Sequence, residues 1–186
     1  MAVLAKERWL IQISVLGCLL ILGAVLLANV GAQQVDEYQV KAAFICNFPN
    51  FVEWPPDTYK SPADPFSVCV LGRNPFGRAL EGLAAGRVID GHIFAVRHVS
   101  DVRQVAGCQI LFVSASERLR FRSILEPLKT TSVLSIGDTN DFIAEGGVVG
   151  LKVEGGKVRV EIDPKAAKLK NLRVSSHLLG LAKVAK

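Results

Sequence analysis

The chain has 186 residues, of which 50% are hydrophobic, 21% charged and 7% aromatic, and its formal charge is +5. This apolar fraction excludes an intrinsically disordered chain. Four cysteines are too few for a disulfide-rich miniature scaffold, and the low aromatic content argues against a protein that binds nucleic acid by base stacking. The length suits one domain that buries its own core.

The N-terminus has the plan of a secretory signal peptide. Lys6 and Arg8 form a short basic region before a long apolar run, which closes on the small residues Val30-Gly31-Ala32. Small side chains at these positions are what signal peptidase reads. We therefore predict that residues 1–32 are removed and that residues 33–186 form a domain exported to the periplasm.

Two alternatives remain for the same segment. The apolar run is long enough to span a bilayer, so it could stay attached as a signal anchor with the domain facing the same compartment. The sequence Val15-Leu16-Gly17-Cys18 resembles a lipoprotein box, although an apolar stretch follows it where a lipoprotein turns polar.

The next segment begins as a helix. Apolar side chains recur at helical spacing across residues 34–48, and Pro49 ends that pattern. Residues 51–56 are apolar and contain two prolines, which predicts an extended turn.

The middle of the chain alternates short apolar runs with helical stretches. Helices are predicted at residues 75–83 and 117–128, the second with Ser116 as its N-cap. The apolar runs predict buried strands at residues 66–72, 93–98, 109–114 and 133–137. Continuous apolar strands separated by helices are typical of a parallel sheet covered on both faces.

The C-terminal part has a different pattern. Residues 148–154 and 157–163 alternate across Gly155-Gly156, which predicts an antiparallel hairpin. Pro164 then opens a predicted final helix that reaches residue 184. The expected fold is thus a single α/β domain: a mostly parallel sheet with helices on both faces, a C-terminal hairpin and a final helix.

The last segment is basic and has no acidic side chain. Such a tail is either the solvated face of a helix or a surface for an anionic membrane or an acidic partner. An exported protein rarely meets nucleic acid, so none is expected as a partner. The basic residues are Lys165, Lys168, Lys170, Arg173, Lys183 and Lys186.

Polar residues follow three of the predicted parallel strands, where ligands of such sheets bind. Backbone N–H groups at the starts of the following helices favour an anionic or zwitterionic small molecule. Because the same residue types form turns and caps, a purely structural role is the alternative. The candidate pocket residues are Arg73, Asn74, Ser114, Ser116 and Glu117.

Nothing in the sequence calls for catalysis. There is no nucleophile elbow and no metal-ligand spacing. We therefore expect that the protein is not an enzyme and that it binds no metal and no cofactor. The isolated histidines are His92, His98 and His177, and the carboxylates considered for a catalytic pair are Glu53, Glu117, Asp138 and Asp141.

Three cysteines remain after export, which implies one bridge with a leftover thiol, or an intermolecular bridge. Cys69 lies within one predicted strand and Cys108 at the start of another, so both are held in place and are the expected disulfide pair. A residue in the middle of one strand does not normally lie level with the start of its neighbour, however, so the two strands would have to be offset for the bridge to form. Cys46 is the candidate free thiol, with a small buried hydrophobe as the alternative.

A series of short motifs resembles the YfiR-like family of exported bacterial proteins. The resemblance runs in order from about residue 37 to residue 184. The motifs are Glu37-Tyr38-x-Val40-Lys41-Ala42-Ala43-Phe44, Asn47-Phe48, Phe51-Val52-Glu53-Trp54-Pro55, Cys69-Val70-Leu71-Gly72, Asn74-Pro75-Phe76-Gly77, Cys108-Gln109-Ile110-Leu111-Phe112, Ser116-Glu117, Gly146-Gly147, Val158-Arg159-Val160-Glu161-Ile162 and Ser175-Ser176-x-Leu178-Leu179-x-Leu181-Ala182.

The resemblance implies a periplasmic repressor rather than an enzyme. In the best-known member of the family, the protein binds the periplasmic sensor region of an inner-membrane diguanylate cyclase and so lowers cyclic di-GMP synthesis and biofilm formation. An outer-membrane lipoprotein with a peptidoglycan-binding module sequesters the repressor. The family is also dimeric, which implies a homodimer, and its disulfides matter to stability.

For this implied role we expect the partner surface at Phe51, Glu53, Trp54 and Arg173. Trp54 could instead be a core anchor over the sheet, and Arg173 a solvated cation at a helix start. The alternative function is a periplasmic small-molecule sensor that acts on another membrane receptor or kinase through the candidate pocket.

The chain departs from the family pattern at two places. Relatives carry a second cysteine pair around residues 143–150, which this chain lacks. Cys46 and Pro49 also interrupt a first helix that is usually unbroken.

Overall fold

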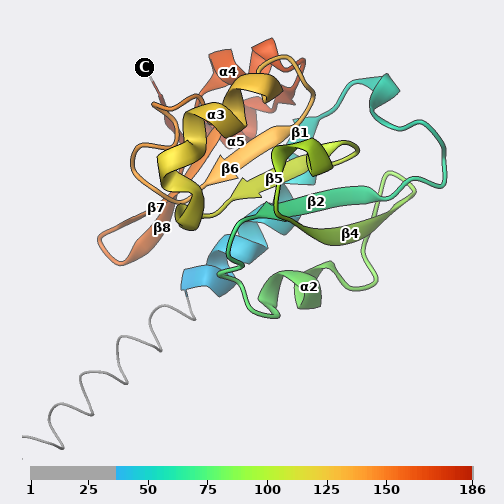
Figure 1. Ribbon diagram of the computed structural model, residues 1–186, viewed down its shortest axis with the longest axis horizontal. Coiled ribbons are helices and arrows are strands. Elements are labelled where there is room, and N and C mark those ends of the chain that lie inside the picture. The colour runs from blue at the N-terminus through green and yellow to red at the C-terminus, as the bar shows by residue number, and fades with distance from the viewer. Residues whose placement is uncertain (1–36, 186) are drawn as a thin grey trace, which may run out of the picture. The chain divides into compact units, whose positions relative to one another are not determined.

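The computed structural model describes residues 37–185, so the predicted signal peptide lies outside the described residues. Residues 38–185 form one compact unit, organised around an eight-stranded sheet with the strand order β10-β8-β7-β6-β5-β2-β4-β3 (Figure 1). The strands are β2 (Phe66–Leu71), β3 (Val88–Ile89), β4 (His92–Val99), β5 (Ile110–Val113), β6 (Leu134–Gly137), β7 (Val149–Glu154), β8 (Lys157–Ile162) and β10 (Lys183–Val184).

The centre of the sheet is parallel. β2 pairs in parallel with both β4 and β5, and β5 pairs in parallel with β6. The antiparallel pairs are β3 with β4 and the β7–β8 hairpin. Every residue of β2, β5 and β6 is buried, because helical segments cover both faces of these strands. The expected α/β fold with a mostly parallel sheet and a C-terminal hairpin is confirmed.

Each face of the sheet has its own hydrophobic core. On one face the first helix (residues 37–47) packs Ala42 and Ile45 against β2 and β5. On the other face α3 (Phe121–Leu125) packs Phe121 and Ile124 against the same strands, and Figure 1 shows α3 in front of the sheet with the first helix behind it. Complete burial of one such aliphatic side chain contributes about 1.5–3 kcal/mol to folding.

The helices are shorter than predicted. α2 (Ala79–Ala84) begins four residues later than expected, because residues 75–78 form turns. The helix predicted over 117–128 is divided into η4 (Ala115–Arg120), α3 and η5 (Glu126–Leu128), and Pro127 cannot donate the backbone hydrogen bond that a continuous helix needs. The remaining 3-10 segments are η1 (Phe48–Asn50), η2 (Pro56–Thr58) and η3 (Val102–Val105).

The expected C-terminal helical segment is present, but it is not one continuous helix over residues 164–184. The segment forms α4 (Pro164–Leu169), the strand β9 (Arg173–Val174), α5 (Ser176–Leu181) and β10. Asn171 adopts a left-handed φ of 55°, which ends α4, and Ser175 caps α5 by accepting the backbone N–H of Leu178. Because the helix is interrupted here, β9 can pair with a strand more than a hundred residues earlier in the chain.

Candidate partner-binding surface

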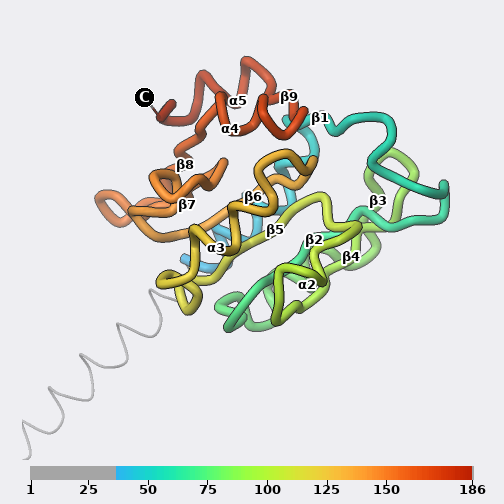
Figure 2. The backbone as a smooth tube through the Cα atoms, turned by 45° about the horizontal axis from the view of Figure 1, so that its top comes forward, coloured from blue at the N-terminus to red at the C-terminus, as the bar shows by residue number. Residues whose placement is uncertain are grey.

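The four residues predicted to bind a partner lie close together on a small ribbon. β1 (Val52–Glu53) pairs antiparallel with β9, which places Glu53 directly opposite Arg173 (Figure 2). The Arg173 guanidinium is 3.6 Å from the Glu53 carboxylate, and both side chains are largely exposed, at 86% and 74%. The sequence placed Arg173 in a helix and so could not show that it faces Glu53.

Aromatic side chains fix this ribbon to the domain. Phe51 stacks on His177 of α5 with ring centroids 5.9 Å apart. The half-buried Trp54 donates its indole N–H to the Gln109 backbone oxygen at 3.1 Å and packs edge-on against Phe66. Trp54 therefore serves as an anchor over the sheet while part of its ring stays accessible.

A groove runs along each side of the segment from Glu53 to Pro56. The first, of about 720 Å³, lies against α4 and β9 and is lined by Ala167, Leu172, Val174 and Leu179, with Lys168 and Arg173 among its lining residues. The second, of about 700 Å³, lies toward β3. The ribbon with these two grooves, from here on the ribbon surface, combines apolar walls with exposed charge, as protein-binding surfaces do.

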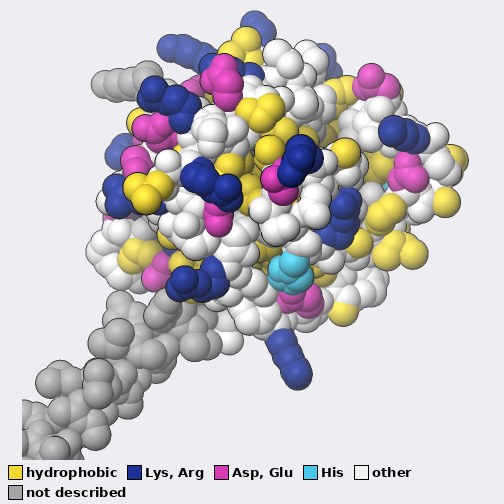
Figure 3. Space-filling view, viewed as in Figure 1, with side chains coloured by type: hydrophobic (Ala, Val, Ile, Leu, Met, Phe, Trp, Pro, Cys, Tyr) yellow, Lys and Arg dark blue, Asp and Glu magenta, His cyan; other side chains and the backbone are white. Residues whose placement is uncertain are grey.

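The face around α3 has a different character. Figure 3 shows basic and acidic side chains intermixed over this face. Arg118 pairs with Asp141, and Arg122 pairs with Glu145 at 3.2 Å. The charged groups of this face are thus used in ion pairs with one another.

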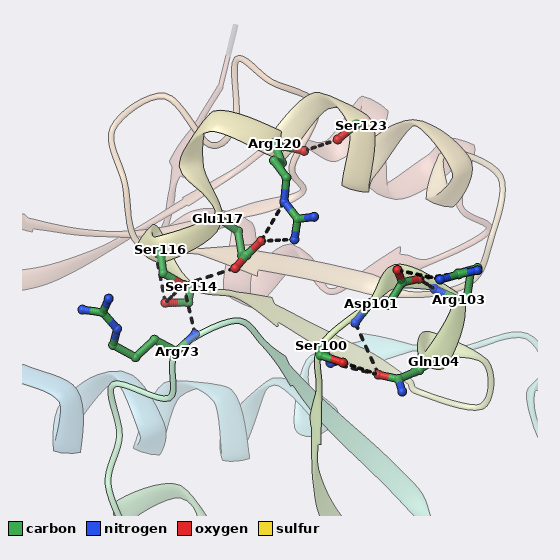
Figure 4. A network of polar contacts seen from close by, with 10 residues as sticks. All are labelled: Arg73, Ser100, Asp101, Arg103, Gln104, Ser114, Ser116, Glu117, Arg120 and Ser123. Atoms are coloured by element: carbon green, nitrogen blue, oxygen red, sulfur yellow. Dashed lines mark hydrogen bonds and ion pairs between the residues drawn. The ribbon is translucent and has the colours of Figure 1, made fainter.

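The candidate pocket residues gather where the strand order reverses between β2 and β5. The Arg73 backbone N–H donates to Ser116 Oγ at 2.9 Å, and Ser116 Oγ lies 3.3 Å from Ser114 Oγ. The Glu117 carboxylate accepts the Arg120 Nε–H at 3.0 Å. In Figure 4 the Arg73 side chain extends away from this cluster.

These groups are therefore bonded to one another rather than open to a ligand. The prediction that Ser116 caps the following helix is wrong: Ser114 is the cap and accepts the Ser116 backbone N–H. Gly72 has a φ of +89°, and a Cβ there would lie 2.6 Å from Ser116 Oγ, so the strand end and the cap pack tightly. Asn74 is also used locally, since its side chain accepts the Phe76 N–H.

A buried charge cluster lies at the end of β6 and was not predicted. Asp138 accepts the Tyr38 hydroxyl at 2.7 Å and pairs with Lys41 at 3.3 Å, and the Lys41 and Asp138 side chains are only 2% and 3% exposed. The signal in the sequence was a tyrosine and a lysine three residues apart on one helix face. A buried pair of this kind holds the first helix to the sheet, because removing either partner leaves an uncompensated charge.

The disulfide joins Cys69 to Cys108, with the Cα atoms 6.0 Å apart. Arg97 lies beside Cys69 on β4 and donates to the backbone oxygens of Ala106 and Gln104, which holds the turn before β5 against the sheet. This turn brings Cys108 within reach despite the difference in strand position. Cys46 is a free, buried cysteine, and burial raises the pKa of its thiol.

The family model of YfiR/HmsC-like proteins matches residues 38–183. The chain belongs to this family. Membership implies a periplasmic regulator of a non-catalytic family, in agreement with the motifs in the sequence. No curated protein matches this YfiR/HmsC-like chain significantly.

Solved structures also align with part of the chain. One is described as the ABC domain in complex with L-Trp from Streptococcus pneumonia, with a TM-score of 0.48 and 10% sequence identity. That alignment covers 64% of the YfiR/HmsC-like chain, and the chain spans 55% of that structure's length.

The histidines of this YfiR/HmsC-like protein lie apart. His92 stacks on Tyr59, His98 contacts Glu81 at 2.8 Å and His177 stacks on Phe51. Among residues 37–185 no group of three or more His, Cys, Asp or Glu side chains is arranged to hold a metal ion. Within the same range, no helix combines the length and apolarity needed to cross a membrane.

Proposed function

We propose that this YfiR/HmsC-like protein binds the periplasmic sensor region of an inner-membrane diguanylate cyclase through the ribbon surface and holds the enzyme inactive. The observation that carries the proposal is the exposed Glu53–Arg173 pair between two grooves. Exposed charge beside partly buried aromatic side chains is the usual composition of a contact surface in a regulatory complex.

Repression follows from preferential binding to one state of the cyclase. A protein that binds the inactive sensor conformation more tightly shifts the population toward it. If half of the free cyclase is active, a preference of about 100-fold holds nearly all of it inactive at saturation. The Trp54 hydrogen bond attaches the ribbon to the sheet before the partner binds, which reduces the conformational entropy lost on binding.

Two further partners belong to the same proposal. An outer-membrane lipoprotein with a peptidoglycan-binding module competes for the repressor and so restores cyclic di-GMP synthesis. The repressor itself acts as a homodimer, which sedimentation of the purified protein tests directly. The alternative role as a small-molecule sensor stays a prediction. The polar groups of its candidate pocket form hydrogen bonds with one another, which gives this role less support.

The first experiment measures cyclic di-GMP in a strain that lacks the protein and in strains complemented with variants. Deletion should raise the level, and Arg173→Glu should fail to lower it, because the reversed charge weakens binding by about tenfold or more. Arg122→Glu is the matched control, as this arginine is equally exposed and also paired, but lies away from the ribbon surface.

The charge-swapped protein Glu53→Arg/Arg173→Glu separates folding from binding. It keeps an ion pair in the ribbon but reverses the charges that the partner meets, so it should fold normally and still fail to repress. An unchanged cyclic di-GMP level in the deletion strain would refute the cyclase role.

A further inference from the structure

One strand of the sheet has a partly open edge. β8 pairs along its whole length with β7, but its other side pairs with β10 at only two positions, Glu161 and Ile162. Residues 157–160 have no strand on that side within the described chain. The Asp163 N–H donates to Val148 on the β7 side, so the backbone groups of alternate residues, Val158 and Val160, face the open edge.

An apolar groove of about 480 Å³ lies beside this edge. It is enclosed by the first helix, the loop before β1, and α5, which runs next to β8 in Figure 2. Its apolar lining residues are Phe44, Phe48, Phe51, Val158, Val160, Leu178, Leu181 and Ala182. Leu181 is 74% exposed at the mouth of the groove.

The two faces of the open edge differ in chemistry. Val158 and Val160 join the core on the groove side, so the side chains of Lys157 and Arg159 start from the opposite face, although Arg159 also contributes to the lining of the groove. Glu161 lies on the same face as these two cations and is paired with Lys152. Lys157 and Arg159 are both exposed, and neither forms an ion pair with another described residue. An added strand would therefore meet an apolar groove on one face and positive charge on the other.

We propose that the open edge of β8 binds an extended segment of a partner protein in which apolar and acidic residues alternate. The backbone of the segment extends the sheet, its apolar side chains enter the groove, and its carboxylates face Lys157 and Arg159. A second copy of this chain fits less well, because two-fold pairing of the edges would set these cations against their own copies. This site goes beyond the proposed repression and does not depend on it.

The test uses a blocked seven-residue peptide that alternates glutamate with valine, added to the purified, isotope-labelled protein. We expect saturable shifts of the amide resonances along residues 157–160 and at least about tenfold slower hydrogen exchange at Val158 and Val160. Arg159→Glu should weaken binding by about fivefold. Lys165→Glu makes the same change of charge on α4 and should leave affinity unchanged.

Two backbone-methylated peptides test strand addition itself. Methyl groups on the valine nitrogens and on the glutamate nitrogens point to opposite edges of an extended peptide, so one peptide should bind normally and the other should not. Equal binding of both would overturn the proposal, as would the absence of shifts at about 1 mM peptide, which corresponds to negligible affinity. Concentration-dependent self-association that protects the same amides would assign the edge to a second copy instead.

Peptide binding at the β8 edge can be tested separately from repression of the cyclase. Arg159 and Lys165 lie outside the ribbon surface, so Arg159→Glu should still repress the cyclase even if it no longer binds the peptide. Loss of repression together with loss of peptide binding in Arg159→Glu would show that the two surfaces are not independent.

Discussion

Lys170 is a buried amine at the end of α4. Its side chain is 2% exposed and its ammonium group donates to the Leu128 backbone oxygen, which ties α4 to the segment after α3. Burial lowers the pKa of Lys170 to about 8, because the charged form is poorly solvated there. A charged lysine in this place opposes folding at neutral pH.

The lowered pKa of Lys170 makes the free energy of unfolding depend on pH. The unfolded chain binds this proton more tightly than the folded protein, so the free energy of unfolding rises as pH increases from about 8 to about 10.5, by about 3 kcal/mol. Urea unfolding across this range should show the rise in the natural protein and lose it in Lys170→Met. Lys168→Met changes an exposed lysine nearby and should keep the rise. If the free energy of unfolding rose with pH equally in the natural protein and in Lys170→Met, Lys170 would not be the source of the pH dependence.

At the level of elements, the C-terminal segment shows what local sequence patterns cannot reveal. Apolar spacing alone favours one helix over 164–184, and nothing nearby in the chain shows that Val174 pairs with Val52. The strands of the central sheet were predictable because they are buried on both faces and so read as continuous apolar runs. The Lys41–Asp138 pair is equally non-local, joining residues 97 positions apart.

The cap of α5 offers a test of this reassigned segment. The Ser175 hydroxyl accepts the Leu178 N–H at 3.2 Å, so Ser175→Ala should lower the free energy of unfolding by about 1 kcal/mol. Ser176 is exposed and is the first residue of α5, and its side chain is not the cap, so Ser176→Ala should change stability by less than about 0.5 kcal/mol. A single helix through this region would make the two substitutions equivalent, and chemical denaturation of the pair distinguishes the cases.

For the whole molecule, the predicted partner residues converge because two distant segments form the ribbon. The carboxyl ends of β2 and β5 also converge, as their topology requires, but the side chains there bond to one another. The parallel arrangement of the central strands could thus be inferred from the sequence, whereas the use of each polar group depended on packing. By contrast, Glu53 and Arg173 of the ribbon surface stay exposed, and residues 157–160 of β8 have no strand on one side within the described chain.

The disulfide acts on the whole domain, since Cys69 and Cys108 are 39 positions apart in the sequence and enclose α2, β3 and β4. By the chain-entropy model, closing a loop of this length stabilises the folded state by about 4 kcal/mol. Cys69→Ala/Cys108→Ala should lose about that amount, and reductant should destabilise the natural protein but not this variant. Cys46→Ala, which leaves the bridge intact, should remain sensitive to reductant. Equal urea midpoints with and without reductant in the natural protein would show that the bridge contributes nothing to stability.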